Sequence, residues 1–488
     1  MTTENQRGVV FPMADDGRRS TSALGRSVVA DALRSVDPLG ARAADQETAW
    51  RSGYLVHFRR LVEAGLGSRA DAVAIANAGL GAAHERMRVL AEDGEERSLA
   101  DWPRSRTDLA TDEVSGDGER ETELSVPYHG HRLRGDELRR RLDAWVGDGV
   151  VEPTVAEAVS AVLARPDWLR LDGYTVAVLG AGAEMGPLPS LLRWGARVAA
   201  LDLARPAIWE RVLRLGREGA GTVLFPHTPG GAGHLERSAG VDLSADVPSV
   251  VDWLASDNRR LVLGNYVYAD GATNVRVSMA VDELSRRLLD QREDIALGFL
   301  ATPTDVFAVP GDAVAHSTRA YEQRSARAKL LGRPLRTLSG GRLLRRSYRP
   351  GADPGINDSM IAQQGPNYAL AKRLQRWRAT VAREAGTTVS MNVAPPTRTR
   401  SVVKNRALAA AYAGAHRFGV EVFEPATSNV LMAALLVHDL QTGGGPRHEH
   451  PWQDEAYAAV HGGLWRTPYA PRSALGLAAL LGYGGARG

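Results

Sequence analysis

The 488-residue sequence contains no cysteine, which excludes disulfides, thiolate nucleophiles and cysteine-ligated metal sites. Long apolar runs are also missing, because "VLMAALLV" and "LGLAALLGY" are far shorter than the ~20 residues that a membrane-spanning helix needs. The beginning, "MTTENQRGVVFPMADDGRR", has acidic residues and an apolar stretch too short for a signal sequence. These absences predict a soluble, cytoplasmic protein with no membrane partner.

The sequence also has little excess charge of either sign. Its formal net charge of +3 is too small to indicate nucleic acid, and "RTRSVVKNR" has no accompanying nucleic-acid fold signature. The charge is uneven, however: residues 330–406 contain fifteen Lys/Arg and three Asp/Glu, a net charge of +12. This stretch is either a solvated face or a field that attracts an anionic substrate or carrier. We therefore expect a small-molecule or carrier-bound partner and no nucleic acid, and a homo-oligomer is left open.

Strand-like and helix-like segments alternate in the second part of the chain. "YTVAVLG", "GARVAALD", "GTVLFPH", "RRLVLGNYVY", "DIALGFLA" and "TTVSMNVA" are separated by helical stretches, which predicts a doubly wound, parallel, Rossmann-like α/β sheet. The predicted organisation is a helical N-terminal region, 1–170, with an irregular linker at about 96–124; a Rossmann-like catalytic domain, 171–440, with an insertion at about 306–360; and a tail with short helices, 441–488.

The first strand of this region runs into a glycine-rich loop, "VAVLGAGAEMGPLPSLLRWGARVAALD". Gly180, Gly182 and Gly186 let the backbone approach a pyrophosphate, whose charge suits a helix N-terminus. Asp202, at the end of the next strand, can accept from a ribose hydroxyl. A tight turn without any ligand produces the same pattern, so the loop alone does not decide between the two.

A second pattern lies in "NYALAKRLQRWRATVAREAGTTVSMNVAPPTRT". Tyr368 precedes Lys372 by four residues, so that both side chains share one face of a predicted helix. An ammonium near a phenol is suited to proton transfer, and a half-buried packing tyrosine is the alternative. His448 and His450 in "RHEHP" are interpreted as solvated loop residues, and no metal site is predicted.

Three landmarks occur in one order: "GAGAEMG", then "AGVDLSADVPSVVDWLA", then the Tyr-x-x-x-Lys helix with "SMNVAPPTRT". In this order they resemble the short-chain dehydrogenases/reductases. The resemblance implies an NAD(P)-dependent oxidoreductase that interconverts a carbonyl and a hydroxyl group, with NAD preferred because of Asp202. The implied cofactor contacts are Gly180, Gly182, Glu184, Met185, Gly186, Asp202, Asp242, Leu243, Asn265, Lys372, Pro395, Thr397 and Thr399.

The resemblance also implies catalytic roles. Tyr368 exchanges a proton with the substrate oxygen, and Lys372 favours the phenolate and binds the nicotinamide ribose. A hydroxyl group should steady the substrate oxygen, but Gly355 occupies the position of the usual serine. We expect Thr302 or Thr304 to serve instead, with Ser359 as the alternative.

Two other functions stay open at this point. An S-adenosylmethionine-dependent methyltransferase shares the glycine loop and the acid after the second strand, although Val178 stands where those enzymes usually have an acid. A non-catalytic dinucleotide sensor is favoured by the displaced serine and by Glu184, which replaces the middle glycine of the short-chain turn. Glu184 predicts either simple capping or altered cofactor binding.

Overall fold

The computed structural model describes residues 7–14, 16–103, 108–228 and 235–484. In this part of the chain a seven-stranded sheet has the order β14-β11-β10-β7-β8-β9-β4. All neighbouring strands from β14 to β9 are parallel, and β4 is antiparallel. The parallel strands, in chain order, are β7 (Tyr174–Leu179), β8 (Arg197–Leu201), β9 (Thr222–His227), β10 (Arg260–Asn265), β11 (Ile295–Ala301) and β14 (Thr388–Val393).

Numbered along the chain, the parallel strands give the order 3-2-1-4-5-6 of the doubly wound Rossmann fold. The predicted fold class is therefore confirmed. The direction of winding reverses between β7 and β10, and ligands of such sheets bind outside the carboxyl ends of the strands at this switch point. The glycine-rich loop leaves β7 at this edge.

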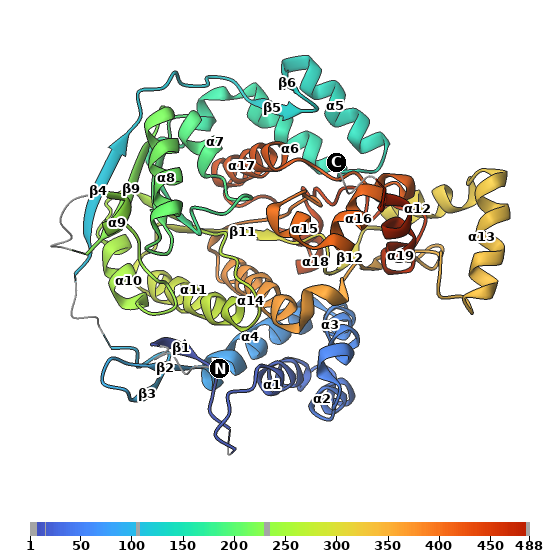
Figure 1. The fold of residues 1–488 in the computed structure, drawn as a ribbon, viewed down its shortest axis with the longest axis horizontal. Coiled ribbons are helices and arrows are strands. Elements are labelled where there is room, and N and C mark those ends of the chain that lie inside the picture. The colour runs from blue at the N-terminus through green and yellow to red at the C-terminus, as the bar shows by residue number, and fades with distance from the viewer. Residues whose placement is uncertain (1–6, 15, 104–107, 229–234, 485–488) are drawn as a thin grey trace.

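Helices cover both faces of the sheet, which is why the parallel strands consist of nearly continuous apolar residues. Along β7, Val176 and Val178 belong to one hydrophobic core, and Ala177 and Leu179 to the other. One core includes α6 (Pro153–Ala164), α7 (Leu188–Arg193), α8 (Pro206–Glu218) and α17 (Pro425–Gln441); the other includes α10 (Val247–Ala255), α11 (Ala272–Gln291) and α14 (Gly365–Glu384). Figure 1 shows these two layers above and below the sheet.

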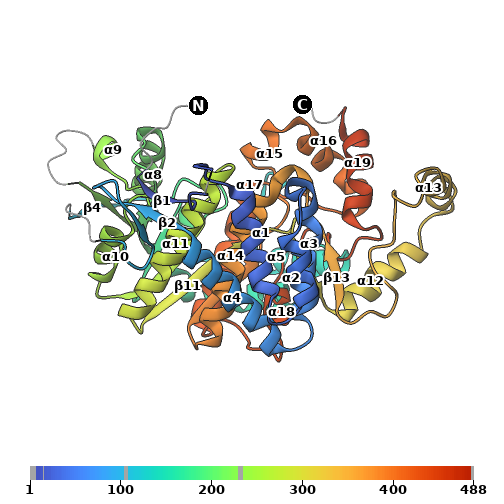
Figure 2. The same cartoon turned by 90° about the horizontal axis from the view of Figure 1, so that it is seen from below.

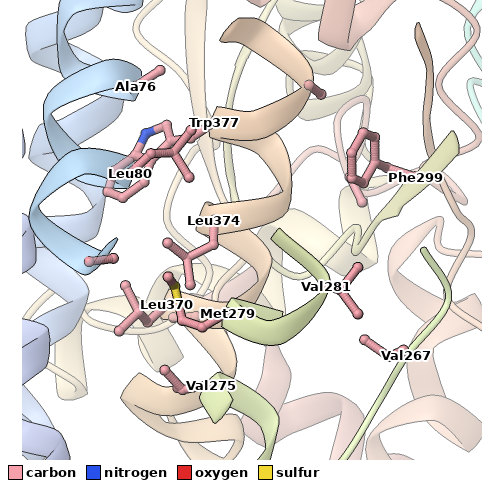
Figure 3. Close-up of a cluster of buried hydrophobic side chains, with 14 of the residues drawn as sticks. Ala76, Leu80, Val267, Val275, Met279, Val281, Phe299, Leu370, Leu374 and Trp377 are labelled. Carbon is pink, nitrogen blue, oxygen red and sulfur yellow. The ribbon is translucent and has the colours of Figure 1, made fainter. Parts of the chain in front are cut away.

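The N-terminal helices add a further layer outside α11 and α14 (Figure 2). They are α1 (Thr21–Leu33), α2 (Pro38–Asp45), α3 (Trp50–Gly65) and α4 (Arg69–Arg86). In Figure 3, Ala76 and Leu80 of α4 face Trp377 of α14. Gly79 permits this close approach, because a Cβ there would lie 2.3 Å from Cζ3 of Trp377. Asp282 of α11 joins the layers, since its carboxylate accepts from Arg378 at 2.7 Å and pairs with Nε2 of His84 at 2.6 Å.

The expected irregular linker at about 96–124 is wrong in part. Within it, β4 (Ala110–Ser115) pairs with β9 and forms the edge of the main sheet. Its burial alternates along "ATDEVS", because an edge strand buries only part of its surface, and the polar residues obscured the strand pattern. The other elements before β7 are β1 (Gly8–Val10), β2 (Arg88–Leu90), β3 (Glu96–Ser98), β5 (Ser125–Tyr128), β6 (His131–Arg134), α5 (Gly135–Gly147) and the 3-10 helix Pro166–Arg170.

Residues after β11 form an excursion that returns to its starting point. β12 (Val306–Val309) pairs antiparallel with β13 (Gly355–Asp358), and α12 (Gly311–Glu322) and α13 (Ala326–Leu338) lie between them in the chain. Figure 1 shows α13 standing away from the body of the molecule. The ladder brings Ser359 back beside Asp305, where its N–H donates to the Asp305 carbonyl at 3.2 Å.

The C-terminal part contributes α15 (Arg400–Lys404), α16 (Arg406–Gly414), the 3-10 helix Ala415–Phe418, α18 (Pro451–Ala456) and α19 (Pro471–Gly482). α16 packs along α19, and their backbones come so close that a Cβ on Gly482 would lie 2.0 Å from the Ala410 carbonyl oxygen. Across the four described ranges, no helix has both the length and the apolar character needed to cross a bilayer.

Candidate active site

Tyr368 and Lys372 lie one turn apart at the beginning of α14 and line the same small cavity. Thr302 and Thr304, which follow β11, line it too. Its volume of about 10 Å³ is enough for about one water molecule. The fold therefore brings together four of the five residues expected to act in catalysis.

Tyr54 of α3 also lines this cavity, and sequence reasoning missed it. Burial raises the pKa of Tyr54 to about 12, and the nearby backbone of Gly365 acts in the opposite direction. No local signal could have found this residue, because more than three hundred positions separate it from Tyr368. The N-terminal helices thus form part of the wall of the candidate active site.

The hydroxyl groups of Thr302 and Thr304 line the same cavity as the phenol of Tyr368. Oγ1 of Thr302 lies 2.8 Å from Oγ1 of Thr304. Burial raises the pKa of Tyr368 well above the ordinary value for a phenol, and the side chain of Thr302 only partly offsets this rise. The phenol is therefore held in its protonated form. That Lys372 favours the phenolate stays a prediction.

The ammonium of Lys372 donates to the carbonyl oxygen of Leu300 at 3.2 Å and to Oε1 of Gln375 at 3.0 Å. Nε2 of Gln375 in turn donates to Oδ1 of the buried Asn265, at the end of β10, at 3.4 Å. Burial lowers the pKa of Lys372 to about 8, and Asp305 acts in the opposite direction. Gln375 was not predicted, although it lies three residues after Lys372 on the same helix and connects it to Asn265.

Asp305 lines the small cavity and anchors a buried ion-pair network there. Its carboxylate accepts from Arg373 at 3.1 Å, from Arg376 at 2.7 Å and from the N–H of Val306 at 2.7 Å. Arg376 also makes a two-point contact with Glu455, at 2.7 and 2.6 Å. Several charges of the +12 stretch are thus neutralised inside the protein by acids outside that stretch, so the charge count overstated the field that a ligand meets.

Gly355, which stands where the usual serine was expected, is required by close packing. A Cβ on Gly355 would lie 2.4 Å from Cγ2 of Val314, so that no serine fits without rearrangement. Ser359 is buried and donates to Oδ1 of Asn357. It lines a larger neighbouring cavity together with Thr304, and not the small cavity of Tyr368. Thr302 is therefore the hydroxyl placed best to assist Tyr368.

The glycine-rich loop is bonded tightly to the end of β8. The N–H groups of Gly180 and Ala181 donate to the Leu201 carbonyl at 2.8 and 3.1 Å. The carboxylate of Asp202 accepts from the N–H of Gly182 at 2.8 Å and from the N–H of Leu203 at 2.7 Å. Burial raises the pKa of Asp202, and these two bonds oppose the rise. Asp202 is at the predicted place, and its contact with a ribose stays a prediction.

Glu184 bridges the loop to the segment after β14. Its Oε2 accepts from the backbone N–H of Arg400 at 2.8 Å, and its Oε1 lies 3.0 Å from Nε of the same residue. Next along the loop, Met185 is half-buried against the core below, and the carbonyl of Gly186 accepts from Asn429 of α17. The following helix, α7, has only six residues, with proline at its N-terminus. The carboxylate of Glu184 thus lies in the loop where a diphosphate was expected.

The second landmark, which in the short-chain enzymes would contain a strand that ends at Asp242, is not a strand here. The third parallel strand is β9, about fifteen residues earlier, and "VDLSAD" is a loop whose Val241 N–H donates to the Asp202 carbonyl at 2.9 Å. Asp242 is exposed, and Leu243 is buried in the core that also holds Val9 of β1. The alternation of apolar and polar residues looked like a strand, but no ladder partner is available on that side of the loop because β8 already pairs with β9.

After β14, Pro395 and Thr397 are buried, whereas Thr399 is partly exposed. Oγ1 of Thr397 donates to the Pro395 carbonyl at 2.9 Å and lies 2.7 Å from Oγ of Ser428 on α17. Oγ1 of Thr399 lies 3.0 Å from Oγ of Ser401. Their contacts to a carboxamide stay predictions.

The two histidines of "RHEHP" hold the loop before α18 in place. Nδ1 of His448 lies 2.8 Å from Asp454, and Nε2 of His450 lies 2.9 Å from the carbonyl of Gly65 in α3. They are packed against protein groups instead of being solvated. Within the described ranges, no group of three or more His, Asp or Glu side chains is arranged to hold a metal ion.

Comparisons with known proteins found no matching family model and no matching curated protein. Among solved structures, the chain is similar to an oxidoreductase of the short chain dehydrogenase/reductase family from Burkholderia thailandensis, with 16% identity, 60% of this chain and 92% of that chain covered, and a TM-score of 0.32. It is similar to an A1-type ketoreductase at 14% identity, covering 55% of this chain and 47% of that one, with a TM-score of 0.31.

A third similar structure is the terminal R domain from the myxalamid PKS-NRPS biosynthetic pathway, at 14% identity, with 60% and 69% covered and a TM-score of 0.29. The chain spans about half the length of the ketoreductase chain that it matches. TM-scores this low carry no argument about activity. The strand order and the loop at the switch point define the class, a Rossmann-like α/β protein.

Proposed function

We propose that the protein is an NAD(P)-dependent oxidoreductase that reduces a ketone to an alcohol. The observation that carries this proposal is the meeting of Tyr368, Lys372 and Thr302 around one cavity beyond the carboxyl end of β11. A protonated phenol, an ammonium and a hydroxyl group in one desolvated place suit a reaction in which negative charge develops on a carbonyl oxygen.

In this proposal, NAD(P)H held beside Lys372 would supply the hydride for the carbonyl carbon of the substrate. Oη of Tyr368 donates its proton to the carbonyl oxygen as the C=O π bond breaks, and the product is the neutral alcohol. After the transfer, the Tyr368 phenolate regains a proton from water, and the hydroxyl groups of Thr302 and Thr304, 2.8 Å apart beside it, would relay that proton. The Lys372 ammonium, across the same cavity, stabilises the negative charge that develops on the oxygen.

The residues suit a dinucleotide unequally along its length. The catalytic end is suitable, because Lys372, Gln375 and Asn265 form a polar network beside Tyr368. The loop end carries Glu184, whose carboxylate repels a diphosphate. We infer that the chain binds the cofactor with an affinity that Glu184 reduces.

Calorimetric titration tests this inference. NADH should bind at least about tenfold more tightly than NADPH, because a phosphate placed beside Asp202 meets a negative charge.

Glu184→Gly should tighten NADH binding by about fivefold, because it removes the carboxylate that repels the diphosphate. A charge interaction at a partly exposed site such as Glu184–Arg400 contributes at most ~1 kcal/mol, which corresponds to about this factor. Glu184→Gln is the matched control for charge and should have the same effect. Tighter NADPH binding, or no change in either variant, contradicts the inference.

The pH dependence of reduction follows from Lys372. Its pKa is lowered by burial from 10.5 to about 8, so the side chain is charged below that pH and neutral above it. With saturating NADH, kcat/KM should therefore fall as the pH rises through about 8. Lys372→Arg keeps its charge at higher pH, so the decline should move upward in that variant. A flat profile up to about pH 9.5 in the unmodified protein would show that the ammonium does not take part.

The methyltransferase and the sensor predict other results in the same titrations. S-adenosylmethionine should not compete with NADH if the proposal holds. NADH binding without turnover of any ketone favours the non-catalytic sensor. The displaced serine no longer supports the sensor, because Thr302 supplies a hydroxyl group at Tyr368.

A further inference from the structure

A second, larger cavity opens beside the one that holds Tyr368. Its volume is about 70 Å³, and it lies among α16, the 3-10 helix Ala415–Phe418, α19 and the segment after β13. Its walls are mainly apolar, with Met360, Ile361, Phe418, Val422 and Leu475 among the residues that form them.

The two cavities share part of their walls. Thr304, Met360 and Ile361 line both, so the larger cavity begins where the hydroxyl pair of Thr302 and Thr304 ends. The phenol of Tyr412, which also lines the larger cavity, is near enough to Tyr368 to contribute to the rise of its pKa. A ketone whose carbonyl oxygen lies at Tyr368 would therefore direct one of the two substituents of its carbonyl carbon into the larger cavity.

The charges around the larger cavity indicate which kind of ketone substituent can bind inside it. Among the described residues that line it, Arg472 is the one with a charged side chain; it is exposed at the rim and paired with Asp358 at 2.8 Å. An anionic group inside would lose its hydration, and the one guanidinium in the lining is at the rim and already paired with Asp358, so burial of the anion is strongly unfavourable. An apolar group gains by leaving water. The volume is about half that of a cavity known to hold benzene, so about three or four carbon atoms fit.

We propose that this cavity, defined by Met360, Ile361, Ala415, Phe418, Val422 and Leu475, binds the uncharged aliphatic side of the ketone and excludes carboxylates. The inference rests on the proposed function for the position of the carbonyl group. It replaces the anionic substrate expected from the +12 stretch with an apolar one, at least on this side of the carbonyl.

Two matched ketones test the proposal. 2-Hexanone and 5-oxohexanoate share a methyl ketone and a three-methylene chain, and they differ in a terminal methyl or carboxylate. Binding to the full chain, without a hydride donor, is measured by saturation-transfer difference NMR. 2-Hexanone should bind at least about tenfold more tightly, because the carboxylate pays a desolvation cost in the apolar cavity. Equal or tighter binding of 5-oxohexanoate, or no binding of either ketone, overturns the proposal.

Filling the cavity provides the second arm. Ala415→Phe should weaken 2-hexanone binding at least about tenfold, whereas Ala407→Phe, at an exposed position of α16 outside the cavity, should leave it unchanged. Val422→Phe fills the cavity from another segment and serves if Ala415→Phe does not fold. Unchanged 2-hexanone binding in a folded filling variant overturns the proposal.

These measurements separate the two levels of inference. Binding of 2-hexanone that is sensitive to Ala415→Phe but never leads to reduction supports the cavity and contradicts the proposed activity. Reduction of 2-hexanone that is insensitive to Ala415→Phe supports the activity and overturns the cavity proposal.

Discussion

Tyr368→Phe should lower kcat for ketone reduction by a factor of about 10² to 10⁴, the usual contribution of general acid catalysis. The substitution removes only the hydroxyl group that donates the proton, and the ring keeps its place at the start of α14. NADH affinity should stay within about twofold, since the hydrogen bonds among Lys372, Gln375 and Asn265, the residues proposed to meet the cofactor, are untouched. Single-turnover kinetics with prebound NADH separates this loss from any change in binding.

Tyr268→Phe is the matched control. The ring of Tyr268 lies edge-on to that of Tyr368, with 6.2 Å between centroids, but its hydroxyl donates to the exposed Asp270 at 2.9 Å. Loss of that hydroxyl should change kcat by less than about threefold, because it is not the proton donor. If Tyr368→Phe kept full turnover, the spacing of Tyr368 and Lys372 would be a coincidence without a catalytic role, and the proton donor would lie elsewhere.

Asp305→Asn should lower the free energy of unfolding by about 3 to 5 kcal/mol, because it leaves the buried guanidinium groups of Arg373 and Arg376 without their shared counter-charge. Asparagine has nearly the same size, so the loss reports charge and not a cavity. Urea unfolding at pH 7, followed by circular dichroism, measures it. Asp290→Asn removes a mostly exposed carboxylate that is paired with Arg286 and should change stability by less than ~1 kcal/mol.

The stabilisation by Asp305 should also depend on pH in a defined direction. Burial alone raises the pKa of this carboxyl group, but Arg373 and Arg376 outweigh burial and hold the pKa below the ordinary 3.8. A carboxyl group with a lowered pKa stabilises the fold fully above its unfolded value and loses that contribution as the pH falls through its folded value. The difference in stability between the unmodified protein and Asp305→Asn should therefore shrink below about pH 4. A difference below ~1 kcal/mol at pH 7 contradicts the role assigned to Asp305.

Much of the sheet could be predicted because its signals are local. β7, β8, β9, β10, β11 and β14 each coincide with a mainly apolar segment, and the glycines after β7 mark the turn at the switch point. β4 was not predicted because its sequence is polar, like that of a loop. It is a strand because it pairs with β9, and the local sequence does not show this pairing. The segment at Asp242 is the opposite case: its residues alternate like those of a strand, but it forms no strand, because β8 already pairs with β9.

For the candidate site, the sequence by itself determined which residues share a helix face and which follow a strand. Tyr368 and Lys372 are one turn apart because helical geometry depends only on spacing, and Thr302 and Thr304 come at a strand end for the same local reason. The tertiary structure alone decided that Tyr54 closes the cavity, that Asp305 neutralises Arg373 and Arg376, and that Glu184 meets Arg400. These contacts join residues tens to hundreds of positions apart, and the distance between such residues is set by how the layers pack, which spacing along the chain does not specify.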